Sequence, residues 1–259
     1  MRRRGGSSWF GNPEQATSEW RDLANFMVTT GPLTMHQAAA WLGGPKGQAM
    51  AELNKMTQRQ WMERIDWAAT RSPGVHSTSI QRLVMTGPGA LMALRRNPTG
   101  RLDGWRVCTG VVTGQLVVRL RGAQWCASCE DPRKGLIGKI GVGGGRDAWV
   151  IVLRKTGVGT GRANIDRIVQ NARKCVPSSA RVWAIVPDEA DLSLVDELTK
   201  GADLGDRVLA TTDARLWDRV RPVSRMFLAR TAEGWKPIRL SALEKWDAPV
   251  GTVPATGEA

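Results

Sequence analysis

The stretch MHQAAAWLGGPKGQAMAELNKMTQRQWMERIDW, residues 35–67, decides the fold of the first part of the chain. Thr34 is placed to cap a short helix over MHQAAAWL, and Gly-Gly-Pro at 43–45 interrupts that helix. A second helix starts near Lys46, and its apolar face is expected to carry Met50, Leu53 and Met56. WMERIDW then alternates with a period of two, which predicts a strand. The stretch therefore predicts helix, turn, helix and strand.

The sequences on either side extend this pattern. Before it, apolar residues recur at three- and four-residue spacing from Trp20 to Val28, and Gly31-Pro32 stops them, which predicts an earlier helix. After it, RSPG is a turn and STSIQRLVMT alternates again, so the two strands form a hairpin. GPGALMAL adds a turn and an apolar helix. Three helices and a hairpin over residues 13–95 resemble the winged-helix DNA-binding domains.

That resemblance implies a DNA-binding surface. The third helix would enter the major groove, and the tip of the hairpin would reach a phosphate. The residues expected to contact DNA here are Lys46, Gln48, Lys55 and Arg59 on the helix and Arg71 on the hairpin. Gln48 is the candidate for reading a base edge, because its amide both donates and accepts hydrogen bonds. The alternative is a winged helix that binds protein and not DNA.

The charge of the chain favours a polyanionic partner. Its 259 residues carry 37 Lys and Arg against 24 Asp and Glu, a net charge of +13. Double-stranded DNA is the expected partner, since arginine matches phosphate well. No apolar run approaches the roughly 20 residues of a membrane-spanning helix, and no secretory segment is evident. We expect a cytoplasmic protein of two domains with a disordered tail over 246–259. The protein is expected to pair with a second copy of itself or with a replication or transfer protein.

The second half, residues 104–245, alternates between apolar runs and helical stretches. DAWVIVL and ARVWAIVP predict buried strands, while ANIDRIVQNARK and ADLSLVDELTKGA predict helices. DRVLATT and SRMFLART predict two further strands, and VVTGQLVVRLRG fits a strand or a helix equally well. Buried strands alternating with helices imply a sheet covered on both faces. The expected class is α/β.

Taken together, a winged helix followed by RDAWVIVLRK, RANIDRIVQNAR and RVWAIVPDEADL resembles the replication-relaxation family of mobile genetic elements, over roughly residues 15–215. The resemblance implies a small restriction-endonuclease-like second domain and a role in plasmid replication or mobilisation. It assigns Asp147 to the position of the family's catalytic aspartate and Lys155 to that of its lysine. Glu130, from a preceding helix, would be a second Mg²⁺ ligand.

The sequence departs from that family where catalysis needs acids. Residues 150–153 are Val-Ile-Val-Leu, where the family's carboxylates alternate along the strand. A single aspartate does not hold Mg²⁺, because the ion needs several converging oxygen ligands. We therefore expect a domain that docks on DNA without cleaving it, and a Mg²⁺-dependent nuclease is the alternative. The glycine-rich turn TGVGTG, flanked by Arg154, Lys155 and Arg162, is expected to meet a DNA phosphate.

The cysteines allow a different chemistry. QWCASCEDPRK, residues 124–134, resembles the Cys-x-x-Cys helix start of a thioredoxin-like oxidoreductase. There Cys126 would be a thiolate at a helix N-terminus and Cys129 the resolving thiol. With Cys108 and Cys175 the same pair makes up the four ligands of a Zn²⁺ site, although the spacing is irregular. The simplest interpretation is that these cysteines are small core residues, and no cofactor or metal is expected.

Overall fold

The computed structural model describes residues 16–68, 80–97, 104–122, 128–130, 139–141, 147–154 and 161–238. These residues form a mixed α/β structure with two sheets, so the expected α/β class is confirmed. The chain divides into two compact units, which we call unit 1 (described residues up to Gly114) and unit 2 (described residues from Gln115). The division falls within helix α5, Gly104–Gly122, whereas the sequence places it in the connector before residue 104.

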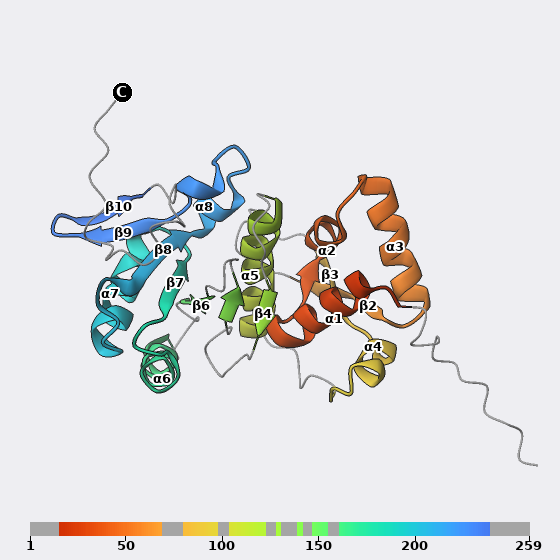
Figure 1. Cartoon of the computed structure of the whole chain (residues 1–259), viewed down its shortest axis with the longest axis horizontal. Helices are drawn as coiled ribbons and strands as arrows, with labels where there is room; N and C mark the ends of the chain where they lie inside the picture. Colours follow the sequence, from red (N-terminus) through yellow and green to blue (C-terminus); the bar gives the residue numbers. More distant parts are fainter. Residues whose placement is uncertain are drawn as a thin grey trace, which may run out of the picture. The chain divides into compact units, whose positions relative to one another are not determined.

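Unit 1 consists of short helices around a three-stranded antiparallel sheet (Figure 1). Its helices besides α5 are α1 (Ser18–Thr30), α2 (Met35–Leu42), α3 (Lys46–Gln58) and α4 (Pro88–Ala93). Its strands are β1 (Leu33–Thr34), β2 (Met62–Ala68) and β3 (Ile80–Thr86). The strand order is β1-β3-β2, with Leu33 opposite Val84 and Met62 opposite Thr86. The predicted hairpin of β2 and β3 is confirmed.

Local capping explains where α2 starts. The Thr34 hydroxyl accepts a hydrogen bond from the backbone N–H of Gln37 at 3.2 Å, and the Gln37 side chain accepts one from the N–H of Thr34 at 3.0 Å. This reciprocal pair is a capping box. The predicted cap is therefore confirmed. On α3 one expectation is wrong: Ala49 is buried with Leu53 and Met56, whereas Met50 is partly exposed, because residues four and seven apart share a helix face.

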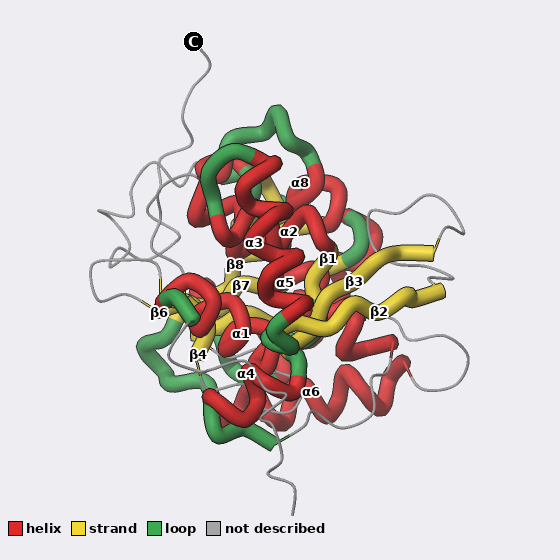
Figure 2. Tube along the Cα trace, turned by 90° about the vertical axis from the view of Figure 1, so that its right-hand side faces the viewer, coloured by secondary structure: helices red, strands yellow, loops and turns green. Residues whose placement is uncertain are grey.

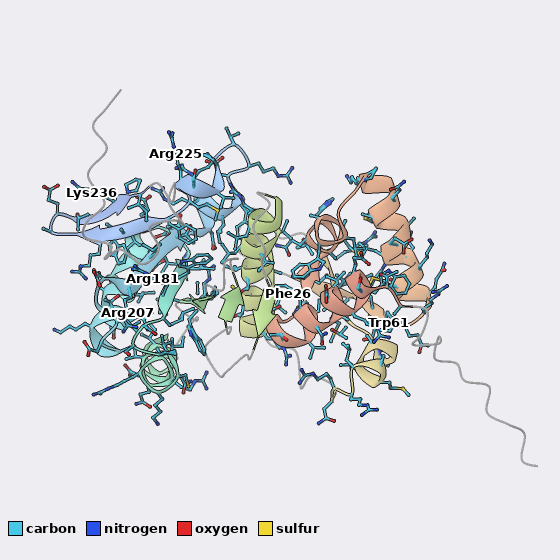
Figure 3. The ribbon with its side chains drawn as sticks, viewed as in Figure 1. Phe26, Trp61, Arg181, Arg207, Arg225 and Lys236 are labelled. Atoms are coloured by element: carbon cyan, nitrogen blue, oxygen red, sulfur yellow. The ribbon has the colours of Figure 1, made fainter. Side chains whose placement is uncertain are left out.

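Aromatic side chains fill the interior of unit 1. The ring centres of Trp20 and Trp61 lie 6.2 Å apart, and those of Phe26 and Trp41 lie 4.5 Å apart. Figure 3 labels Phe26 and Trp61, one residue of each pair. All four residues are buried. Such tilted pairs add about 0.5–1.5 kcal/mol each beyond the apolar area that they bury. They fix α1 against α2 and against the residue that precedes β2.

Unit 2 is built on one long mixed sheet. Within the described residues its order is β10-β9-β8-β7-β6-β5-β4, and β6, β7 and β8 run parallel to one another. The strands are β4 (Ser128–Glu130), β5 (Lys139–Gly141), β6 (Asp147–Val152), β7 (Arg181–Val186), β8 (Val208–Thr212), β9 (Leu228–Thr231) and β10 (Gly234–Pro237). The helices besides α5 are α6 (Gly161–Cys175), α7 (Leu192–Gly201) and α8 (Asp213–Trp217). The predicted buried strands and helices from residue 147 onward are confirmed.

Two expectations about the middle of the chain are wrong. Ser128–Glu130 forms β4, so Cys129 and Glu130 lie on a strand and not in a helix, whereas Cys126 lies outside the described residues. The ambiguous segment VVTGQLVVRLRG is the end of helix α5, whereas a thioredoxin-like arrangement needs a strand there.

The three parallel strands are the most buried part of unit 2. Every residue from Ala148 to Leu153 is buried, as is every residue from Val182 to Val186 and from Val208 to Asp213. Strands β6, β7 and β8 are neighbours in the sheet, and Figure 2 labels β7 and β8 beside each other. Because their carboxyl ends lie at one edge, the residues that follow these strands are brought together there.

Candidate functional site

The exposed face of α3 is the first candidate site. Lys46 and Gln48 lie in its first turn and are exposed. Pro45, at the N-cap, offers no side chain to the first N–H groups of the helix. A Cβ added at Gly43 or Gly47 would meet nothing within 4 Å, so the backbone of the turn and of the first helical turn is accessible. This end of α3 combines a lysine, an amide and uncapped N–H groups, which suits an anion.

The other DNA contacts expected on α3 are partly engaged within the protein. Lys55 is exposed, but its ammonium forms an ion pair with Glu52 at 2.6 Å. The guanidinium of Arg59 lies 5.6 Å from the centre of the Trp20 ring. Arg71 lies outside the described residues. The first turn of α3 is therefore the least encumbered part of this face.

One contact between α3 and the hairpin was not predicted from the sequence. The Arg64 guanidinium on β2 donates a hydrogen bond to the side-chain oxygen of Asn54 on α3. Both residues are exposed. The position of Arg64 among the outward residues of WMERIDW was the available signal, because alternate residues of a strand share a face.

A second candidate lies at the carboxyl edge of the parallel strands. Arg154 follows β6 and Asp213 follows β8, and the Arg154 guanidinium donates to the Asp213 carboxylate at 2.5 Å. The two side chains are only 9% and 11% exposed. The expectation that Arg154 meets a DNA phosphate is therefore wrong in this structure. Its Nε and Nη1 are buried with no hydrogen-bond partner among the described residues.

Burial dominates the titration of Asp213. It raises the pKa of this carboxyl to about 6 from an ordinary 3.8, although the charge and the hydrogen bond of Arg154 oppose the shift. The negative charge of Asp188, which follows β7 and Pro187, raises the pKa further. Desolvation thus exceeds the attraction of the arginine, which is the usual balance for a buried ion pair.

This shift predicts a pH dependence of stability. Since the folded pKa lies above the unfolded one, the folded state holds the Asp213 proton longer, and its contribution to stability is lost as the pH rises through 6. Between pH 5 and 7.5 we expect the free energy of unfolding to fall by about 1 kcal/mol because of this group. Urea unfolding at both pH values should show this fall with pH in the native chain. Asp213→Asn, which cannot titrate at this position, should not show it. Equal slopes in the two chains would contradict the prediction.

The remaining expected site residues are not brought together among the described residues. Asp147 is the first residue of β6 and pairs with Gly141, and Arg162 lies in the first turn of α6, but the side chains of both are outside the described set. Lys155 and Cys126 also lie outside it. Cys108 lies within α5 and Cys175 ends α6, both half-buried.

No group of three or more His, Cys, Asp or Glu residues in the described part of the chain is arranged to hold a metal ion. None of the helices there is long and apolar enough to cross a bilayer. Comparison of the chain with protein-family models, with curated proteins and with solved structures found no match.

Proposed function

We propose that unit 1 is a winged-helix domain that binds double-stranded DNA, with α3 in the major groove and the β2–β3 hairpin as the wing. The order of its elements supports this, since two short helices and a turn precede an antiparallel hairpin. In helix-turn-helix domains the residues at the start of the recognition helix contact the base edges. The observation that carries the proposal is the exposed first turn of α3, which holds Lys46 and Gln48.

We propose further that unit 2 docks on DNA and does not cleave it. Its mixed sheet is in keeping with the restriction-endonuclease-like domain that the sequence resemblance implies. The residues of β6 after Asp147 are buried and apolar, so they offer no second carboxylate for Mg²⁺. The resemblance to the replication-relaxation family is the support for a role in plasmid replication or mobilisation.

Substitutions on α3 test the proposal. Lys46→Ala should weaken binding to every duplex by about 3- to 10-fold near 0.1 M salt and reduce the slope of log affinity against log salt by about 1, because one phosphate contact is lost. Gln48→Ala should instead remove the preference for one sequence, worth about 1–3 kcal/mol. The measurement is fluorescence anisotropy of labelled duplexes from the chain's genetic neighbourhood and of a scrambled duplex.

Gln58→Ala is the matched control, since Gln58 is an exposed glutamine at the other end of the same helix. It should bind as the native chain does. Preference retained in Gln48→Ala would rule out base reading by this residue. Weak binding to every duplex, unchanged by both Lys46→Ala and Gln48→Ala, would favour a winged helix that binds protein.

A further inference from the structure

Residues 218–225, in the connection between α8 and β9, form a loop in which apolar residues are interleaved among arginines. Val220 at its tip is 92% exposed, and Pro222 is exposed as well. The arginines of the segment are Arg219, Arg221 and Arg225. Figure 1 shows the loop extending from α8 before the chain enters β9, and Figure 3 labels Arg225 on it. We call residues 218–225 the arginine loop.

Two half-buried side chains of α5, Arg119 and Gln115, hold this loop. The guanidinium of Arg119, in the part of α5 that belongs to unit 2, donates to several backbone carbonyl oxygens around the loop. The acceptors are Arg215 at 3.0 Å, Leu216 at 2.9 Å, Asp218 at 2.7 Å and Arg221. Gln115, one turn earlier, donates to the Leu216 carbonyl at 3.3 Å. The path of the backbone is therefore set by side chains far away in sequence.

Contacts within the loop also hold its backbone. The Asp218 carboxylate accepts hydrogen bonds from the N–H groups of Val220 at 3.1 Å and Arg221 at 3.2 Å. Its other oxygen pairs with Nε of Arg221 at 3.3 Å. A single 3₁₀ turn, Val223–Arg225, then leads the chain toward β9. A tip ordered in this way loses little conformational entropy when it binds a partner.

We propose that the arginine loop is a second DNA contact, made by unit 2 in the minor groove. The proposal rests on the proposed function in taking duplex DNA as the partner. Arginines are attracted to the negative potential of a narrow minor groove, and apolar side chains often accompany them in proteins that bind there. Val220 and Pro222 provide too little apolar area for a protein interface, which needs about 800 Å² from each partner. Because Val220 and Pro222 alternate with arginines, they are placed to contact the edges of sugars and bases.

The DNA contact proposed for the tip of the arginine loop can be tested with matched charge variants. Val220→Asp places a carboxylate at the tip, and Ala232→Asp places the same charge at the exposed turn between β9 and β10. On the duplex that the full chain binds best, we expect Val220→Asp to bind about tenfold more weakly and Ala232→Asp less than twofold. Arg219→Ala should lose about 3- to 10-fold, whereas Arg173→Ala on α6 should change little. Loss confined to the loop variants supports the proposal, and equal effects of loop and control variants overturn it.

Footprinting separates this proposal from that for α3. Hydroxyl radicals report protection of sugars in the minor groove, and dimethyl sulfate reports guanine N7 in the major groove. We expect a patch of sugar protection that Val220→Asp removes and Gln48→Ala leaves in place. Absence of that patch overturns the minor-groove assignment. Sugar protection without any dimethyl sulfate protection or Gln48 effect supports the arginine loop and overturns the role of α3. Tighter binding of double-stranded RNA, with the same loss in Val220→Asp, overturns DNA as the partner of the loop.

Discussion

Replacement of Asp213 by alanine is expected to destabilise unit 2 by about 3–5 kcal/mol, because it leaves a buried guanidinium without its partner. Arg154 and Asp213 are joined at 2.5 Å, and both side chains are about nine-tenths buried. Nε and Nη1 of Arg154 already lack partners among the described residues, so no other group there is placed to compensate. An arginine side chain keeps its charge inside a protein, so deprotonation offers no escape from this cost.

Replacing Arg154 in place of Asp213 should destabilise unit 2 less, which makes the prediction specific to charge. In Arg154→Met the remaining group is Asp213, and a carboxyl whose pKa is already near 6 can take up a proton. The difference between the two single variants should grow below pH 6, where that proton is available. Arg154→Met combined with Asp213→Leu removes both charges and should recover most of the loss, since apolar replacements of buried ion pairs are often close to neutral.

Hydrogen exchange of the β7 and β8 amides is the suitable measurement, because it reports the stability of unit 2 by itself. Asp206→Ala removes an exposed carboxylate from the same unit and is the control, with an expected change within about 0.5 kcal/mol. The explanation fails if the β8 amides are protected from exchange as strongly in Asp213→Ala as in Asp206→Ala. It also fails if the double variant is no better than the worse single one.

The parts of the fold that local signals determine could be predicted from the sequence. Thr34 and Gln37 cap α2, Gly31 ends α1, and the alternation of WMERIDW gives β2 its faces. Each of these signals acts between residues that are close in the chain. The buried strands of unit 2 were predictable for a related reason, since residues 148–153, AWVIVL, form an unbroken apolar run with no charged side chain that would face water.

The errors arise where the outcome depends on distant residues. Cys-x-x-Cys is compatible with a helix start, but pairing with Lys139–Gly141 makes the second cysteine part of a strand. Arg154, beside a glycine-rich turn, has the sequence context of a phosphate ligand. It is nevertheless buried in an ion pair with Asp213, which lies 59 positions away in the sequence. Arg119 is one of three arginines in α5, and nothing nearby in the sequence indicates that its guanidinium fixes the arginine loop.

A close approach of backbones inside unit 1 gives the second large effect. Gly110 of α5 faces the connection between α1 and β1, where a Cβ would lie 2.5 Å from the Pro32 oxygen, 2.7 Å from the Gly31 carbonyl carbon and 2.9 Å from the Pro32 nitrogen. These are backbone atoms and cannot rotate away. Gly110→Ala should therefore destabilise unit 1 by about 3 kcal/mol, at the upper end of the usual cost of overpacking. Hydrogen exchange of the α1 and β3 amides measures this loss.

The sign of the effect distinguishes packing from helix propensity. Glycine to alanine within a helix ordinarily stabilises by up to about 1 kcal/mol, since alanine restricts the unfolded chain and favours the helix. Gly47→Ala on α3 is the matched control, because a Cβ there meets nothing within 4 Å. It should leave unit 1 as stable as before or slightly more so. If Gly110→Ala were also neutral, α5 would have to pack less closely against Gly31 and Pro32 than these distances require, and the bond from the Gln37 side chain to the Val111 carbonyl, 2.7 Å long, would be the next contact to test.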